Sequence, residues 1–479
     1  MAFMPDAALI WFRQDLRLAD NPALAAVQDR PVLPVHVLED GPGAPGGAAR
    51  WWLHHSLVSL GRALAERGTP LLVLRGDPRR LIPAIAAQVG ATEIHAGRQT
   101  EPAARQRDAE THDALQRDGR RLVLHRNALL HEPHLVRTGA GKPFSVYTPF
   151  SRAVFALLEG LPPPIPAPDR LTPATGGPAG LGPAAFGLLP APPEPDWAAE
   201  FPSHWTPGEA GAAARLAAFL DAGLATYAAR RNMPAAEWGT SGLSPHLHLG
   251  EISPRQVWHA AQAQGGAGLE TFLKEILWRE FSHHLLWHRP EMPGQPLRPE
   301  FNAFPWRSDP AMLRAWQRGR TGIPIVDAGM RQLWRSGWMH NRVRMIVASF
   351  LVKHLLQPWQ SGEAWFRDTL VDADLAANAA SWQWVAGCGA DAAPYFRIFN
   401  PVLQGAKFDA EGAFVRRWCP ELARLPDRFI HCPHEAPPDI QRAAGVAIGR
   451  TYPAPIIDLA EGRARALAAF AAIKGIEAA

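Results

Sequence analysis

Five short apolar runs, separated by segments of helical length, fill the first 126 residues and restrict the possible folds more than any other feature. Such runs are typical of strands buried on both faces, and strands that alternate with helices form parallel sheets. The pattern therefore predicts a doubly wound α/β domain over residues 1–130. The predicted strands are residues 8–12, 32–38, 70–76, 93–97 and 121–126. No GxGxxG follows the first strand, which leaves a sheet edge or switch point for a ligand.

The pattern changes after residue 130. Residues 161–195 contain 12 prolines, and proline fixes φ and lacks an N–H group, so we expect residues 131–204 to form an interdomain linker. From residue 205 onward strand signals fade and helical periodicity dominates, for example over residues 271–286 and 328–356. The chain is therefore expected to combine an α/β domain with an all-α domain over residues 205–479.

Composition bounds the class of protein. The chain is 47% hydrophobic and 20% charged, which is typical of globular proteins and excludes a disordered one. Its three cysteines form no CxxC, which predicts a reducing compartment without disulfides, zinc or iron–sulfur sites. No apolar stretch is long enough for a transmembrane helix or a signal peptide, so we expect a cytoplasmic protein. A coiled-coil stripe is absent, and we expect a monomer.

Tryptophan is used unusually often, with 18 tryptophans against 4 tyrosines. Core packing and coding bias explain such an excess, and so do aromatic stacking and electron transfer. Composition alone favours core packing. The net charge of +4 permits a nucleic-acid partner without arguing for one.

Short polar segments mark candidate sites in the helical part. Thr240, Ser241 and Ser244 precede a predicted helix, where N–H groups and hydroxyls suit a phosphate, although an ordinary N-cap explains them better on spacing alone. In the predicted helix 271–286, Glu275 shares a face with Trp278 and Arg279. A Glu–Arg pair is usually a solvated surface pair, but a tryptophan is less usual on a wet face.

The predicted helix 328–356 places Asn341, Arg344 and Met345 on one face, which suits a pocket wall or a helix edge equally well. Asp372 and Asp374 lie in a turn, and Asp372 can pair with Arg344. A metal site at these carboxylates is the competing interpretation, but it lacks a third ligand at useful spacing.

Five segments together resemble the photolyase/cryptochrome family over nearly the whole chain. They are WFRQDLRLADNPAL (11–24), GTSGLSPHLHLGEIS (239–253), KEILWREF (274–281), TGIPIVDAGMRQLWRSGWMHNRVRM (321–345) and residues 370–400. The resemblance implies a flavoenzyme that uses light to repair cyclobutane pyrimidine dimers in DNA, most similar to the class III and class I bacterial photolyases.

The resemblance also implies roles for individual residues. Asn378 would face flavin N5, where plant cryptochromes carry an aspartate. Trp382, Trp359 and Trp306 match the family's electron-transfer chain. The FAD-binding positions are Tyr227, Thr240, Ser241, Leu243, Ser244, Phe272, Arg279, Arg344, Asp372, Asp374 and Asn378. Catalytic positions at the lesion are Glu275, Asn341, Met345 and Asn378, and DNA-binding positions are Arg231, Trp278, Asn341, Arg342, Trp384, Arg397 and Gln404.

Within the family, three positions favour dimer repair over the alternatives. Asn341 and Met345 stand where (6-4) photolyases carry a histidine pair, and Trp384 stands where plant cryptochromes carry a tyrosine. On a helix, Trp382 and Trp384 point to opposite sides, so only one of them faces a pocket. The alternatives are a cryptochrome-like photoreceptor, repair of (6-4) photoproducts, and a light-independent DNA-binding module. The chain's short end after residue 452 argues against the photoreceptor.

Two departures from the family pattern stand out. Gly242 stands where the usual family motif, GTSRLSP, has an arginine. This difference predicts the loss of a contact near phosphates or DNA. Ala103 and Ala104 stand where folate-binding relatives carry an Asn–Glu pair. Residues 46–57, with Trp51 and Trp52 as candidate stacking partners, resemble class III enzymes, which hold 5,10-methenyltetrahydrofolate at another site. We therefore expect that antenna, with 8-hydroxy-5-deazaflavin as the alternative.

Overall fold

The computed structural model describes residues 7–41, 43–189, 196–391 and 396–474, which form two compact units. The first, called the α/β unit, comprises the described residues within 1–196, 202–225 and 241–290. The second, called the helical unit, comprises the described residues within 197–201, 226–240 and 291–479.

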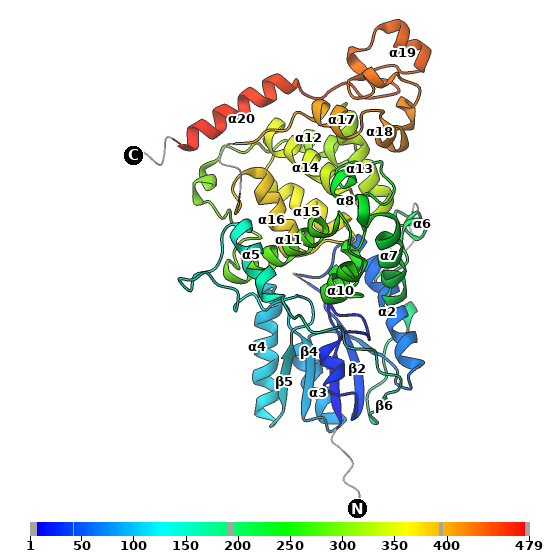
Figure 1. Ribbon diagram of the computed structural model, residues 1–479, viewed down its shortest axis with the longest axis vertical. Helices are drawn as coiled ribbons and strands as arrows, with labels where there is room; N and C mark the ends of the chain where they lie inside the picture. Colours follow the sequence, from blue (N-terminus) through cyan, green and yellow to red (C-terminus); the bar gives the residue numbers. More distant parts are fainter. Residues whose placement is uncertain (1–6, 42, 190–195, 392–395, 475–479) are drawn as a thin grey trace, which may run out of the picture. The chain divides into compact units, whose positions relative to one another are not determined.

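A parallel sheet with strand order β3-β2-β1-β4-β5 forms the centre of the α/β unit (Figure 1). Its strands are β1 (Ala8–Trp11), β2 (Pro31–Leu38), β3 (Leu72–Arg75), β4 (Glu93–Gly97) and β5 (Arg121–His125). Each of them coincides with a predicted run to within two residues at either end. The central strand β1 is buried along its whole length, as expected for a strand covered on both faces. The predicted doubly wound α/β fold is therefore confirmed.

Helices of this unit begin where the sequence offers caps. Asn21 and Asp77 accept hydrogen bonds from the first turns of the helices that follow them, and Ser253 forms a capping box with Gln256. The helices are α1 (Pro22–Ala25), α2 (Gly47–Ala65), α3 (Pro78–Gln88), α4 (Pro102–Arg117), α5 (Tyr147–Leu157), α7 (Glu209–Ala222), α9 (Ser244–Leu249), α10 (Pro254–Gln264) and α11 (Leu269–His288). The predicted helix 271–286 is confirmed as α11.

The switch point of the sheet, between the carboxyl ends of β1 and β4, is filled by side chains. Arg13 follows β1, donates to the carbonyl of Gly97 and forms a 2.5 Å ion pair with Asp108, both side chains being 5% exposed. Its guanidinium and that of Arg107 lie 4.6 Å and 5.0 Å from the ring of Trp11. A planar ligand at this point would have to displace this network.

The proline-rich segment contains some regular structure. Helix α5 precedes it, and β6 (Thr172–Pro173) pairs with the first residues of β2. Ala174 and Leu181 donate backbone hydrogen bonds to Val32 and Val73, which ties the segment to the sheet.

The helical unit packs its helices around one large apolar core. Its helices are α8 (Tyr227–Arg230), α12 (Pro310–Gln317), α13 (Pro324–Ser336), α14 (Asn341–Ser349), the π-helical turn Phe350–His354, α15 (Trp359–Thr369), α16 (Leu375–Ala386), α17 (Pro401–Phe408), α18 (Ala413–Trp418), α19 (Pro438–Ala444) and α20 (Leu459–Lys474). The short helix α6 (Phe201–His204) precedes α7.

The prediction of one helix over residues 328–356 is wrong. Helix α13 ends at Gly337, whose φ of +65° lies in the left-handed region that glycine adopts without strain. A Cβ at this glycine would press against Phe201 and Val371, so the chain turns there in close contact with its neighbours. Helix α14 starts afresh at Asn341, with His340 as its N-cap.

None of the described helices combines the length and apolar character needed to cross a membrane. Likewise, no three histidine, cysteine or carboxylate side chains among the described residues gather as metal ligands. The metal alternative for Asp372 and Asp374 therefore gains no support.

Candidate functional site

An ion pair between a half-buried arginine and a buried carboxylate joins α14 to the turn before α16. One nitrogen of Arg344 donates to both carboxylate oxygens of Asp372, at 2.7 Å and 3.0 Å, and the Asp372 side chain is 3% exposed. A second donor of Arg344 contacts the carbonyl of Met339 at 2.7 Å. The predicted pair is confirmed, and a charge-assisted contact of this kind fixes both side chains.

Asn378 is held in one orientation by a residue that the sequence did not point to. Asp374 caps α16 by accepting from the N–H of Ala377 at 2.8 Å, and Asn378 follows one turn after the cap. Its amide nitrogen donates to the side chain of Glu363 at 2.9 Å and to the Glu363 carbonyl at 3.1 Å. Burial raises the pKa of Glu363. The side-chain oxygen of Asn378 accepts no hydrogen bond from the part of the chain that the structure describes, so it can accept from an N–H group of the expected flavin.

The two tryptophans of α16 lie on different sides of that helix. Trp382 is 2% exposed, packs its ring 5.0 Å from Phe366, and lies against Gly362, where a Cβ would clash with it. Trp384 is half-buried and donates to the carbonyl of Asp391 at 3.1 Å. The prediction that they point in different directions is confirmed.

The other two tryptophans of the predicted chain differ in their exposure. Trp359, the first residue of α15, is 1% exposed. Trp306 is half-buried and packs 4.4 Å from Phe304. Two buried rings and one partly exposed ring are what electron conduction to the surface requires, and that role remains a prediction.

Three arginines of the helical unit form a cationic cluster. Arg342 donates to the side chain of Asn232 at 2.8 Å and lies 4.6 Å from the ring of Phe408. Burial, together with the neighbouring charges of Arg231 and Arg397, lowers the pKa of Arg342. Such a concentration of positive charge suits phosphate groups.

Other expected residues occupy the first turns of helices in this unit. Asn341 begins α14 and is exposed, and Met345 lies one turn later and is half-buried. Tyr227 begins α8, with the guanidinium of Arg231 5.5 Å from its ring, and Gln404 lies in the first turn of α17. Thr240, the last residue of its segment of the helical unit, is half-buried.

His340 gives α14 a pH-dependent contribution to stability. It is 3% exposed, accepts from the N–H of Arg342 at 3.1 Å, and has a pKa lowered to about 3 by burial and by Arg342, Arg344 and Arg231. Below its unfolded pKa of about 6.5, the unfolded state binds the proton and the folded state does not, so stability falls as the pH falls.

His340→Asn should remove this dependence, because asparagine is a good N-cap without a titrating ring. From pH 7 to pH 5 we expect the wild type to lose about 2 kcal/mol more unfolding free energy than the variant. Urea titrations of both proteins at both pH values test this. Equal losses in the two proteins would assign the acid sensitivity to other groups.

In the α/β unit, the turn before α9 shows what replaces the missing motif arginine. Gly242 has a φ of +61°, and a Cβ there would clash with the guanidinium of Arg215 from α7. Arg215 donates to the carbonyl of Ser241 at 2.9 Å. A cation therefore lies beside the turn although residue 242 lacks one. The loss of a contact near phosphates or DNA stays a prediction. Leu243 is buried, and Ser244 begins α9 and is exposed.

Helix α11 carries the remaining expected residues of the α/β unit. Glu275, Trp278 and Arg279 are half-buried on one face, and Phe272 is buried. Arg279 donates to the carbonyl of Ala128 at 2.8 Å, so part of its guanidinium fixes the helix to the chain after β5.

Comparisons with known proteins agree with these features. Residues 8–169 match the family described as DNA photolyase, and residues 272–472 match the FAD binding domain of DNA photolyase. A deoxyribodipyrimidine photo-lyase of Agrobacterium fabrum is 49% identical over 99% of both chains. Cryptochrome-1 of Arabidopsis thaliana is 37% identical over 98% of this chain and 71% of its own. The crystal structure of a class III photolyase from Agrobacterium tumefaciens matches with a TM-score of 0.95 and 48% identity, over 99% of each chain.

Proposed function

The chain belongs to the DNA photolyase family, and we propose that it is a deoxyribodipyrimidine photo-lyase that binds FAD and repairs cyclobutane pyrimidine dimers in DNA. The observation that carries the proposal is the arrangement on α16. This helix combines an amide with a fixed free acceptor at Asn378, a buried tryptophan at 382 and a half-buried tryptophan at 384. A protein that carries out no redox chemistry, such as a light-independent DNA-binding module, does not require this combination of residues.

When bound in its reduced form, FAD supplies the electron that opens the cyclobutane ring under blue light. The protein's part is to bind and orient. Arg344 and Asp372 would hold the ribose and ring side of FAD, and the turn Thr240–Ser244, with Arg215 beside it, would hold the pyrophosphate. Asn378, fixed by Glu363, would accept a hydrogen bond from flavin N5–H.

The DNA side of the proposal uses a different set of groups. Photolyases are known as enzymes that extrude their target from the duplex. Because a dimer stacks poorly on its neighbours, its extrusion requires little free energy. Trp278 and Trp384 would pack on the extruded dimer, and Glu275 would bond to a pyrimidine edge. Asn341 and Met345 would complete the pocket without the histidine pair that (6-4) repair needs. Arg231, Arg342, Arg397 and Gln404 would contact the DNA around the lesion.

For the antenna, we propose 5,10-methenyltetrahydrofolate over 8-hydroxy-5-deazaflavin. The filled switch point around Arg13 and Trp11 supports this choice, because a deazaflavin there would displace a buried ion pair. Both tryptophans are buried, Trp52 with no exposed surface and a hydrogen bond to Glu251 at 3.0 Å, and Trp51 with 5% of its surface exposed. Trp51 is therefore the better candidate for stacking. We further propose that the protein acts as a cytoplasmic monomer.

A direct repair assay tests the proposed function. Reduced protein is mixed with an oligonucleotide that carries one thymine dimer and is exposed to blue light, with a dark sample as control. We expect thymine absorbance to return only in the light. No repair by protein with bound, reducible FAD would contradict the proposal and favour a photoreceptor or a different lesion.

Arg342→Gln should weaken DNA binding without changing sequence preference, because phosphate contacts position DNA without reading it. We expect the slope of log K against log salt to fall by about 1 in magnitude. Arg335→Gln is the matched control, since Arg335 already pairs with Glu200 at 2.7 Å on the surface. Equal salt slopes for wild type and Arg342→Gln would remove Arg342 from the DNA interface.

A further inference from the structure

One face of Trp278 is covered by another aromatic ring from the same unit. Tyr147, the first residue of α5, stacks on Trp278 with ring centroids 3.6 Å apart and planes inclined by 6°. Phe281 closes one edge of Trp278 at 6.0 Å, in a T-shaped contact. Trp278 is nevertheless half-buried, so part of its surface remains accessible.

The position of Tyr147 is itself fixed. The ring is 7% exposed and packs 5.9 Å from Phe281. Its hydroxyl donates to the carbonyl of Lys274 at 2.7 Å. Lys274 lies one helical turn before Trp278 and next to Glu275. Tyr147 therefore contacts α11 both at the Trp278 ring and at the Lys274 carbonyl, close to the residues of α11 that are expected to bind the lesion. A ring held by both stacking and a hydrogen bond restricts the plane of the indole beside it.

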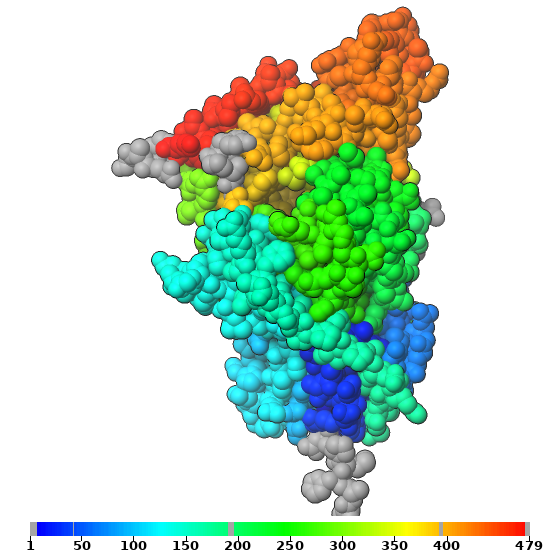
Figure 2. Space-filling view, in the orientation of Figure 1, coloured from blue at the N-terminus to red at the C-terminus, as the bar shows by residue number. Residues whose placement is uncertain are grey.

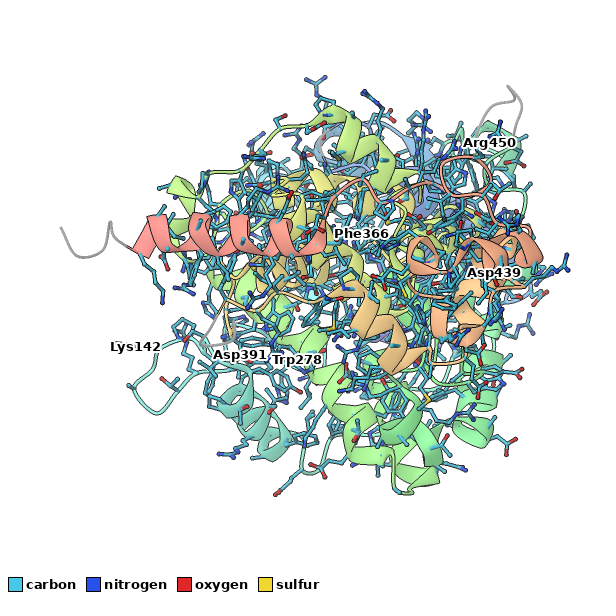
Figure 3. The ribbon with its side chains drawn as sticks, turned by 90° about the horizontal axis from the view of Figure 1, so that it is seen from above. Lys142, Trp278, Phe366, Asp391, Asp439 and Arg450 are labelled. Atoms are coloured by element: carbon cyan, nitrogen blue, oxygen red, sulfur yellow. The ribbon has the colours of Figure 1, made fainter. Side chains whose placement is uncertain are left out.

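The chain before Tyr147 is a compact loop rather than a free linker. The N–H of Thr138 donates to the carbonyl of Lys142 at 2.8 Å, and Arg137 donates to the carbonyls of His134 and Gly141. Lys142 lies at the outer tip of this loop (Figure 3), and the loop protrudes from the surface beside α5 (Figure 2). Tyr147 therefore connects an ordered loop of the predicted linker to α11.

We propose that Tyr147 is a positioning residue for lesion binding, which holds the Trp278 ring in the plane in which it packs on the dimer. The inference rests on the proposed function, because it requires Trp278 to contact the lesion. An unsupported indole would have to be ordered when the dimer binds, and ordering a side chain on binding weakens affinity. Undamaged DNA does not use this surface, so its affinity is independent of Tyr147.

The test compares Tyr147→Leu, Tyr147→Phe and a matched core variant, Phe150→Leu. Phe150 is buried on the same helix and packs 5.1 Å from Phe281, but it has no stacking contact with Trp278 among the described residues. Dissociation constants are measured by fluorescence anisotropy for one oligonucleotide with and without a thymine dimer. The ratio of the two constants reports selectivity for damage, which a general loss of stability does not change.

We expect Tyr147→Leu to reduce the selectivity ratio about five- to tenfold, as the loss of one aromatic stacking contact predicts. Tyr147→Phe, which keeps the ring, should stay within about twofold, the size of a marginal hydrogen-bond effect. Phe150→Leu should retain the wild-type ratio even if its melting temperature falls.

Trp278→Leu separates the inference from the proposed function. If Trp278→Leu loses selectivity and Tyr147→Leu does not, Tyr147 is structural and the inference is overturned while dimer repair stands. If neither variant loses selectivity, Trp278 does not contact the lesion and the inference also fails. Failure of the proposed function shows separately, as absence of light-dependent repair by the wild-type protein.

Discussion

Replacing Trp382 with phenylalanine should nearly abolish the light-driven reduction of oxidised FAD in this protein. Trp382 is buried in the core of the helical unit, and its indole nitrogen has no hydrogen-bond partner among the described residues. A tryptophan radical formed there would find no acceptor for its proton among the described residues and would pass the electron vacancy onward. Phenylalanine fills most of the space but is far harder to oxidise, so the first step of the chain is lost.

The measurement follows the bleaching of flavin absorbance under blue light with an external reductant. Trp258→Phe is the matched control, because Trp258 is 2% exposed in the α/β unit and its indole nitrogen also lacks a partner among the described residues. Both variants, once reduced chemically, should still repair dimers. Photoreduction of Trp382→Phe at the wild-type rate would remove Trp382 from the electron path.

Replacing Arg344 with leucine should produce the largest loss of stability among the site variants. The change removes the ion pair that Arg344 makes with the Asp372 carboxylate, which is 3% exposed. Removing one member of a buried ion pair costs about 3–5 kcal/mol, because the remaining charge stays desolvated. We expect urea denaturation to show a loss of this size, together with loss of FAD during purification.

The surface variant Arg335→Leu is the control, because it shows how much unfolding free energy is lost when an exposed ion pair is removed. Arg335 and Glu200 are each 47% exposed, and such pairs contribute about 0–1 kcal/mol. The double variant Arg344→Leu/Asp372→Leu removes both charges and should recover most of the stability but not FAD binding. Recovery of FAD binding in the double variant would show that the pair is only structural.

The elements that the sequence predicted well are those with a local cause. The strands β1 and β2 are nearly continuous apolar runs, and burial on both faces requires that composition. The break at Gly337 was not predictable from helical periodicity, because apolar residues recur on both sides of it. What ends α13 there is the close approach of Phe201 and Val371, which come from distant parts of the sequence.

The same distinction applies to the candidate site. The pair of Arg344 with Asp372 was predictable, since opposite charges in two recognisable motifs offered a reason for burial. Glu363 and Arg215 were missed because neither belongs to a motif, and their contacts with Asn378 and Ser241 come from helices packed alongside. Spacing along the chain contains no signal for such contacts.

The close approach of Arg215 to Gly242 limits which substitutions position 242 can accept. An arginine restored at position 242 would collide with the guanidinium of Arg215, and it would also adopt a backbone conformation that favours glycine. The collision is with the far end of a flexible side chain, which can move, whereas the positive φ at residue 242 cannot be relieved without rebuilding the turn. The backbone at residue 242, more than the guanidinium beside it, therefore restricts which residues can replace this glycine.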